Sequence, residues 1–361
     1  MFKEEFYSSL KELAALPGGP GREHQVVKKV AELLKPYAPV EVDHMGNVYA
    51  VLEGNKPGPT VMVSAHSDEI ACMVSAIDDK GFLRIERAGG MMNSLLVGRK
   101  VDINGHFGVI GVKAGHMQTP QEKTKVLPIE ELYADVGASS REEVLRMGIN
   151  IGDAVTYISD LDRFTNQNLI CGKAIDNRSC CVLLVELFKK LQDKEFSGTI
   201  VGAVTVQEEV GLRGAQIAGY KVNPDYAIVL DTIACADTPD GSHYPIAIGK
   251  GPVLPLLSGG GARGNVMSSQ MKELITSHAD KMNVPYQLSV TTKGTTDLSA
   301  IHLMREGILG GAITFPRRYS HSPIEMADLS DFEDGFKLLE SLLRDIGNWG
   351  EMKFIQLGSL T

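Results

Sequence analysis

The stretch TIVGAVTVQEEVGLRGAQIAGYKVNPDYAIVLD, residues 199–231, predicts two strands joined by a helix. Its two ends, 199–207 and 226–230, are short apolar runs rich in Val, Ile and Ala, which is typical of strands buried on both faces. Between them, residues 211–219 are predicted to form a helix. A strand, a crossover helix and a second strand are typical of a sheet with parallel strands.

The same alternation extends in both directions along the chain. Two helices, a hairpin and a strand are predicted before the quoted stretch, over 4–16, 22–37, 40–43 with 47–53, and 60–65. A helix over 177–191 comes directly before it, and further elements follow over 266–282, 286–292, 298–306, 310–315 and 331–345. We therefore predict an α/β fold with a central, mostly parallel sheet flanked by helices.

Residues 71–158 have a different texture, with dense glycine, short apolar runs and frequent turns. This pattern is typical of a small β-barrel. It interrupts the α/β pattern directly after the strand at 60–65. The predicted domains are therefore a catalytic domain made of 1–70 and 159–361, and an inserted barrel at 71–158.

Composition excludes several classes of protein. Hydrophobic residues are 43% and charged residues 22% of the 361, close to the average of globular proteins. The net charge of −9 argues against a nucleic-acid partner. No apolar run is long enough for a membrane span, and the N-terminal region lacks the features of a signal peptide. Five scattered cysteines without a CxxC motif predict reduced thiols and a cytoplasmic location.

Side chains able to bind metals gather where the predicted strands end. Three strands are followed, in turn, by His66 with Asp68, by Glu208 with Glu209, and by Asp231. Sites in open α/β sheets lie beyond the carboxyl ends of the strands, so these side chains are expected to lie close together. His66 and Asp68 are two residues apart, and on an extended strand they share a face. This spacing suits an imidazole ligand with a carboxylate beside it.

Two more candidates lie on neighbouring segments. Asp176 precedes the helix at 177–191, and His321 follows the strand at 310–315. Each has an ordinary structural interpretation, Asp176 as a helix cap and His321 as a surface loop residue. The adjacent carboxylates of Glu208 and Glu209 are harder to explain in this way, because at a buried edge they repel each other unless a cation or a shared proton compensates.

Together these residues offer two histidines, two aspartates and one glutamate as ligands, with one glutamate spare. Mixed imidazole and carboxylate ligands suit zinc, cobalt, manganese or nickel. Two ions about 3.5–4 Å apart need a shared carboxylate and two further ligands each, which this set supplies. The spare glutamate can deprotonate a water, so the sequence predicts a hydrolase.

The segments AHSDEI, GKAIDNRS, TVQEEVGLRGA, VLDTIACADTP and RYSHSPIE occur in this order. They resemble the co-catalytic metallo-aminopeptidases of the glutamyl-aminopeptidase/deblocking-aminopeptidase type, enzymes known for tetrahedral (TET) dodecamers. The segments ELYADVGASSREEVLRMGINIGDAVTY and TDLSAIHLMREG also resemble that family, so the likeness covers nearly the whole chain.

The resemblance implies two divalent metal ions per subunit, zinc or cobalt first, with manganese or nickel as alternatives. His66 and Asp231 would hold one ion, and Glu209 and His321 would hold the other. Asp176 would bridge the two. This chain has Asn177 where many members have a second Asp, but that position is not a ligand.

The resemblance also implies the reaction. Glu208 would be the general base on a metal-bridging water and later the proton donor to the leaving amine. Asp68 would orient His66. The enzyme would remove N-terminal residues from short peptides as a metallo-aminopeptidase. The barrel would be the dimerisation domain, with a partner-contacting loop at 116–127, and dimers would assemble into a tetrahedral dodecamer.

Several interpretations stay open. Residues 258–265, SGGGARGN, lack the lysine-serine ending of a P-loop and are predicted to form a loop. Arg263, Arg317 and Arg318 either favour acidic substrate side chains or have structural roles. A related deacylase or carboxypeptidase-like amidohydrolase would use Arg263 or Arg317 to bind a substrate carboxylate. A non-catalytic scaffold is the third alternative, and the intact set of ligands with Glu208 argues against it.

Overall fold

A computed structural model describes residues 2–239, 241, 244–260 and 263–352 of the chain. Its centre is a nine-stranded sheet. The strand order is β1 (Val40–Val42), β2 (Val48–Glu53), β12 (Ser197–Thr205), β3 (Lys56–His66), β13 (Tyr226–Ala234), β17 (Leu309–Arg317), β14 (Val253–Gly260) and β15 (Arg263–Val266), with β16 (Gln287–Val290) also paired to β14.

The middle of the sheet is parallel and its sides are mixed. Strands β12, β3, β13 and β17 run parallel to their neighbours within this group. β2 is antiparallel to β12 on one side, and β14 is antiparallel to β17 on the other. The predicted central sheet is confirmed, and the strands outside its middle make it mixed. A short hairpin such as β1–β2 permits only antiparallel pairing, whereas a parallel pair needs a long crossover.

The prediction of a loop over 258–265 is wrong for the residues that the structure describes. Ser258 and Gly259 of β14 pair with Asn265 and Gly264 of β15 in antiparallel register. Residues 261–262 lie outside the described residues. Glycine permits this pairing, because a Cβ on Gly264 would lie only 2.7 Å from the backbone oxygen of Ser258. The glycine content that suggested a loop therefore reflects close backbone approach.

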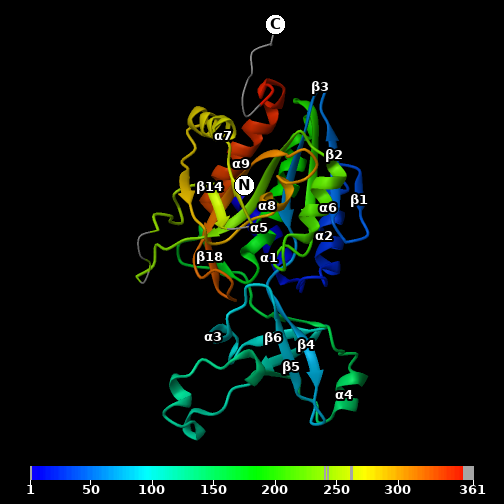
Figure 1. Cartoon of the computed structure of the whole chain (residues 1–361), viewed down its shortest axis with the longest axis vertical. Coiled ribbons are helices and arrows are strands. Elements are labelled where there is room, and N and C mark those ends of the chain that lie inside the picture. The colour runs from blue at the N-terminus through cyan, green and yellow to red at the C-terminus, as the bar shows by residue number, and fades with distance from the viewer. Residues whose placement is uncertain (1, 240, 242–243, 261–262, 353–361) are drawn as a thin grey trace.

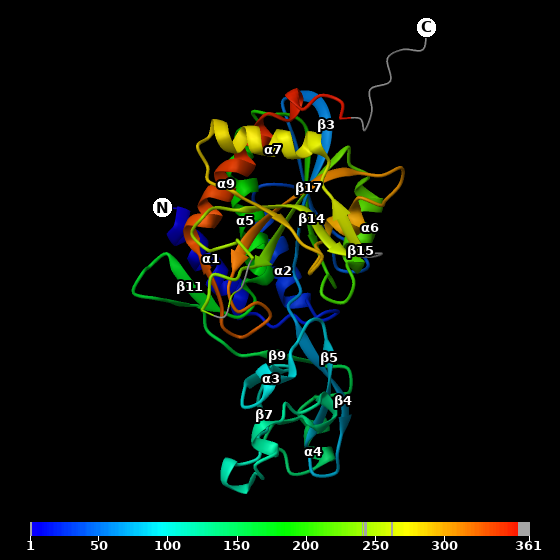
Figure 2. The same cartoon turned by 60° about the vertical axis from the view of Figure 1, so that its left-hand side comes forward.

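Helices cover both faces of the sheet (Figure 2). One face packs against α1 (Phe2–Ala15), α2 (His24–Leu34), α5 (Ile175–Lys190), α7 (Ser269–Lys281) and α9 (Leu329–Arg344), and the other against α6 (Arg213–Val222) and α8 (Leu298–Ile301). The helix predicted over 298–306 is shorter than expected, since the backbone leaves helical geometry before Arg305, whose φ is +54°. No helix in the described ranges is both apolar enough and long enough to cross a membrane.

The predicted barrel is confirmed as a separate lobe below the α/β body in Figure 1. Six strands close on one another in the order β4 (Ala71–Ile77), β5 (Leu83–Ala88), β8 (Tyr133–Asp135), β7 (His106–Ile110), β6 (Lys100–Ile103) and β9 (Ala154–Tyr157). Two short helices, α3 (Asn93–Leu96) and α4 (Arg141–Arg146), also belong to the lobe. The barrel has an apolar core of its own, distinct from those on the two faces of the main sheet.

A second, three-stranded sheet was not predicted from the sequence. It consists of β10 (Asp162–Arg163), β11 (Leu169–Gly172) and β18 (Glu325–Asp328), and it pairs Gly172 with Glu325. This pairing brings the segment leading into α5 beside the segment that follows β17. Asp176 and His321 lie on these two segments, so the small sheet helps to bring them together.

Candidate metal centre

The parallel register of the main sheet aligns the predicted site residues. His66 is the last residue of β3 and pairs with Thr205, the last residue of β12. Glu208 and Glu209 follow three and four residues after Thr205. Asp231 lies within β13, which continues to Ala234 and does not end before it as predicted. The ends of β3 and β12 and the middle of β13 therefore face one site.

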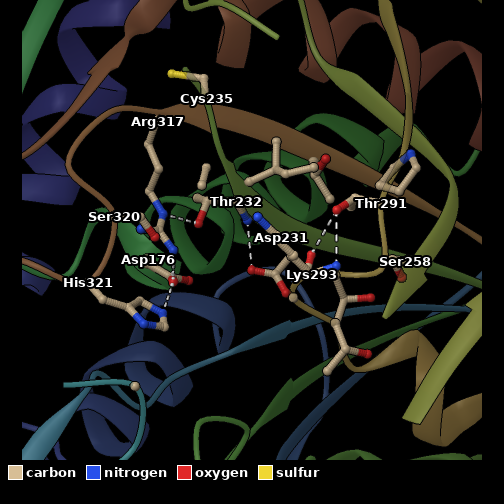
Figure 3. Close-up of a pocket in the computed structure, with 18 of the residues that line it drawn as sticks. Asp176, Asp231, Thr232, Cys235, Ser258, Thr291, Lys293, Arg317, Ser320 and His321 are labelled. Carbon is tan, nitrogen blue, oxygen red and sulfur yellow. Dashed lines mark hydrogen bonds and ion pairs between the residues drawn. The ribbon is translucent and has the colours of Figure 1, made fainter. Parts of the chain in front are cut away.

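Asp176 lies between two groups of candidate ligands. Its Oδ1 atom is 3.2 Å from Nε2 of His66, and that nitrogen is 3.6 Å from Oδ1 of Asp231. Its Oδ2 atom is 3.4 Å from Nε2 of His321, which is 3.5 Å from Oε1 of Glu209. Figure 3 shows His321 directed at Asp176. The fold thus brings all five predicted ligands together, with Asp176 in the middle.

Glu208 lies within reach of one of these groups. One ligand atom each of His66, Glu208 and Asp231 lie within 4.8 Å of one another, as do those of Asp176, Glu209 and His321. The Oε2 atom of Glu208 is 4.0 Å from Nε2 of His66, farther than the corresponding oxygens of Asp176 and Asp231. Of these three carboxylates, Glu208 is therefore the farthest from Nε2 of His66.

Asp68 lies behind His66 and supports the two glutamates. Its Oδ1 and Oδ2 atoms accept hydrogen bonds from the backbone N–H groups of Glu208 and Glu209, at 2.9 and 3.1 Å. Oδ1 is also 3.5 Å from Nδ1 of His66, and the Asp68 carbonyl is 3.1 Å from the same nitrogen. One buried carboxylate thus fixes both the imidazole and the turn that presents Glu208.

The buried carboxylates of the cluster would be stabilised by positive charge. Burial raises the pKa of Glu208, and it raises the pKa of Glu209 to about 8. Burial also raises the pKa of Asp231. Burial opposes ionisation of Asp176 as well, but Arg317 and then the two histidines hold its pKa well below the usual value. Several buried carboxylates in one place are costly to ionise without a cation.

These residues fit divalent cations. The Oδ1 atom of Asp176 is buried, and no hydrogen bond to it occurs within the described part of the chain. A buried acceptor without a partner is uncommon in folded proteins. Imidazole nitrogens and carboxylate oxygens are the donors that zinc, cobalt and manganese accept. A cation would supply the missing interaction.

Two of the three arginines considered from the sequence have structural partners. Arg317 is buried and forms an ion pair with Asp176 (Figure 3) and a second one with Glu325. Arg318 forms a bidentate pair with Asp237, at 2.9 and 2.7 Å. These ion pairs support structural roles for Arg317 and Arg318 over the recognition of acidic substrate side chains. Arg263 is the first residue of β15, and its side chain is outside what the structure describes.

Sequence reasoning missed two buried carboxylates near the site. Glu325 accepts hydrogen bonds from the backbone N–H groups of Asp176 and His321, each at 3.0 Å. Asp297 accepts a bond of 2.5 Å from the hydroxyl of Thr205. The one available signal for Glu325 was its position four residues after His321, in the segment RYSHSPIE. Nothing in the local pattern distinguishes Asp297 from a helix cap.

A cavity of about 950 Å³ opens at the cluster. Besides the candidate ligands and Arg317, its walls include Thr232, Ser258, Tyr244 and the run 291–296. This run, TTKGTT, contributes hydroxyl groups and the exposed Lys293. The cavity is large enough for a short peptide segment, because small-molecule sites span roughly 300–1,000 Å³.

Replacing Asp68 with asparagine should weaken metal binding and activity by roughly 10- to 100-fold, as is typical when the partner of a metal ligand is lost. Each carboxylate oxygen of Asp68 accepts from one N–H group of the Glu208–Glu209 turn, and in asparagine one of these oxygens is replaced by an NH2 group that cannot accept. Calorimetric metal titration and steady-state kinetics measure the two effects. Asp225→Asn, at an exposed residue that accepts a bond from Thr60, is the matched control. Unchanged values for Asp68→Asn would contradict this role.

The chain is similar to known proteins in both sequence and structure. Residues 46–338 match the M42 glutamyl aminopeptidase family. A putative aminopeptidase of Acetivibrio thermocellus is 37% identical over 94% of this chain and 98% of its own length. The aminopeptidase APDkam598 of Desulfurococcus kamchatkensis has a similar structure, with a TM-score of 0.93, 34% identity and coverage of 99% and 100% of the two chains. The TET1 peptidase of Pyrococcus horikoshii is also similar in structure, with a TM-score of 0.83 and 31% identity. The match covers 94% of this chain and 99% of that one.

The fold and site define a metal-dependent aminopeptidase, an enzyme that hydrolyses peptide bonds. The family match covers well over half of the chain, and the relatives align over nearly all of it. The chain belongs to the M42 glutamyl aminopeptidase family.

Proposed function

We propose that this enzyme uses two divalent metal ions to remove N-terminal residues from short peptides. The observation that supports this most directly is the position of Asp176, with one carboxylate oxygen near His66 and the other near His321. In the proposal, His66 and Asp231 hold one ion, and Glu209 and His321 hold the other. Asp176 is shared between them.

The proposed ions are zinc or cobalt, with manganese or nickel as alternatives that the same ligands accept. When bound, two such ions lower the pKa of a water and polarise the scissile carbonyl. The remaining steps belong to side chains of this protein.

Glu208 is the proposed general base. It is not needed as a ligand, because the other five candidates complete the set. Burial raises the pKa of its carboxylate, so it binds a proton more readily than an exposed glutamate does. Glu208 takes a proton from the attacking water and later gives it to the leaving amine. Asp68 holds the backbone of Glu208 in place for both transfers.

The charge of the site favours a substrate with a free α-amine. Carboxylates of the cluster that hold no ion in this proposal, such as Glu208, can pair with an ammonium group. A carboxypeptidase-like enzyme or a deacylase of amino acids needs a basic group for the substrate carboxylate. The guanidinium groups of Arg317 and Arg318 already pair with acidic residues, so neither is free for that role. Lys293 also lines the cavity, and the substrate panel described below distinguishes the two reactions.

We also propose that 1–70 with 159–361 and 71–158 are separate domains, and that the barrel joins subunits into dimers and then a tetrahedral dodecamer. The TET1 peptidase of Pyrococcus horikoshii can assemble into a tetrahedron or a large octahedral shell. The barrel of this chain exposes 60% of Phe107, 64% of Met117 and 61% of Val126, which suits an interface between copies. Light scattering of the purified enzyme tests this assembly.

A substrate panel tests the reaction. We expect cleavage of aminoacyl-p-nitroanilides but not of N-acetyl amino acids, loss of cleavage in excess chelator, and recovery when zinc or cobalt is added back. Cleavage of only the N-blocked substrates would favour the deacylase. Absence of turnover at full metal occupancy would favour the non-catalytic scaffold. Varying the N-terminal residue in the same panel identifies the preferred substrate.

A further inference from the structure

Arg317 is a buried cation in direct contact with the proposed bridging ligand. It stands at the end of β17, and its side chain is only 4% exposed. Its Nε donates to the hydroxyl of Thr232 at 2.6 Å, and one terminal nitrogen donates to Oε1 of Glu325 at 2.8 Å. The other terminal nitrogen donates to Oδ2 of Asp176. All three nitrogens of the guanidinium therefore have partners.

Glu325 connects this cation to the backbone of two proposed ligands. Its Oε1 atom also accepts a hydrogen bond from the N–H of His321, and its Oε2 atom accepts one from the N–H of Asp176, each at 3.0 Å. The residue is 2% exposed. Arg317 and Glu325 thus fix the side chain and backbone of Asp176 and the backbone of His321.

The partner of the third nitrogen lies beside another proposed ligand. Thr232 directly follows Asp231 in β13, and its backbone N–H donates to Oδ1 of that aspartate at 2.7 Å. The guanidinium therefore touches segments that supply three of the five proposed ligands. A planar guanidinium can meet these three directions at once, and a lysine ammonium lacks this fixed geometry.

The charge of the pair matters as much as its hydrogen bonds. Removing one member of a buried ion pair leaves the other charge uncompensated. The cation of Arg317 lies beside Asp176, so it opposes the binding of further cations. The carboxylate of Glu325 offsets part of that effect.

We propose that Arg317 and Glu325 form a positioning pair for the proposed two-metal centre, setting the places of Asp176 and His321 and limiting the negative charge that the ions meet. This proposal rests on the proposed function, since it assumes that Asp176 and His321 bind metal. Neither residue is assigned contact with the reacting atoms, and both act through the ligands that they hold.

The two single substitutions should change metal affinity in opposite directions. Arg317→Met keeps an unbranched side chain but removes the cation beside Asp176, so cobalt should bind about tenfold more tightly because less positive charge opposes it. Glu325→Gln leaves Arg317 uncompensated, and cobalt should bind about tenfold more weakly. Both variants should lose roughly 10- to 100-fold in kcat with little change in KM, because Asp176 and His321 are less well held.

Titration of the metal-free full-length enzyme with cobalt chloride, by calorimetry and by the visible spectrum of the bound cobalt, measures the affinities. Arg318→Met is the matched control, because it removes the same charge at the next position, where the partner is Asp237. Its cobalt affinity and kinetics should match the wild type. If Arg317→Met and Glu325→Gln both weaken cobalt binding, or if neither changes it, the pair has no electrostatic role and the proposal is overturned.

A double variant keeps the test decisive if a single variant fails to fold. Arg317→Met/Glu325→Gln removes both buried charges together, which proteins tolerate better than the loss of one. Its cobalt affinity should lie within about threefold of the wild type while kcat stays low, and a wild-type kcat would overturn the proposal. The wild-type titration checks the proposed function separately. If wild-type enzyme binds two cobalt ions and cleaves peptides, a negative result with the variants counts against the positioning pair alone.

Discussion

Glu208→Gln is expected to lower kcat by about 100- to 10,000-fold, the range typical for loss of a general base. The substitution preserves the shape of the side chain but removes the group that accepts the proton from water. Metal content should stay at the wild-type value, because the five proposed ligands are unchanged. KM should change much less than kcat. Steady-state kinetics on an aminoacyl-p-nitroanilide and elemental analysis of the dialysed protein measure these quantities.

The control for this variant is Glu195→Gln, which makes the same change at an exposed glutamate. Its kinetics should match the wild type. Turnover of Glu208→Gln near the wild-type rate would refute the role of general base. Loss of bound metal together with loss of activity would instead identify Glu208 as a ligand, a result that its distance of 4.0 Å from His66 makes worth measuring.

Asp176→Ala should abolish the binding of two ions per subunit and lower kcat/KM by more than about 100-fold, the upper end of the effect for a residue that only supports a ligand. No other side chain among the candidate ligands has one oxygen near each histidine. The remaining four ligands divide into His66 with Asp231 and Glu209 with His321, and two ligands hold an ion poorly. Elemental analysis and calorimetry give the number of ions bound.

Asp79→Ala is the matched control, since Asp79 is exposed in the barrel. Arg317 loses one partner in Asp176→Ala, so circular dichroism should accompany the titration to show that the variant is folded. A folded Asp176→Ala enzyme that still binds two ions and cleaves peptides would refute the shared-ligand arrangement. Loss of one ion with partial activity would be consistent with a metallopeptidase but would refute the proposal that Asp176 is shared between two ions.

Most of the fold could be predicted from local pattern. The strand 60–65 and the helix 331–345 have periodicities that depend only on neighbouring residues, and both are present as β3 and α9. The barrel could also be predicted, from the dense glycine, short apolar runs and frequent turns of residues 71–158. The strand β14 could not be predicted in this way, because its glycines indicate a turn unless the pairing with β15 is known. The small sheet of β10, β11 and β18 was missed for a similar reason, since its strands are two to four residues long.

The site follows the same division. Ligand-type side chains at the ends of parallel strands could be predicted to meet, because the topology of such sheets fixes where those ends lie. The distances between Asp176 and the two histidines could not be predicted from the sequence. The contacts that Glu325 and Arg317 make with the candidate ligands were also not predicted. Arg317 was considered from the sequence only for binding substrate or for a structural role. Its contact with Asp176 joins residues 141 positions apart.

By itself, the sequence of this protein determined the alternation of strands and helices in the α/β body, the inserted barrel and the set of residues able to bind metal, since these depend on short-range periodicity and on the chemistry of single side chains. Only the tertiary structure decided that Asp176 stands between two histidines and that a buried arginine and glutamate hold it there. Such contacts depend on how strands and helices pack across long separations, and no local pattern encodes that packing.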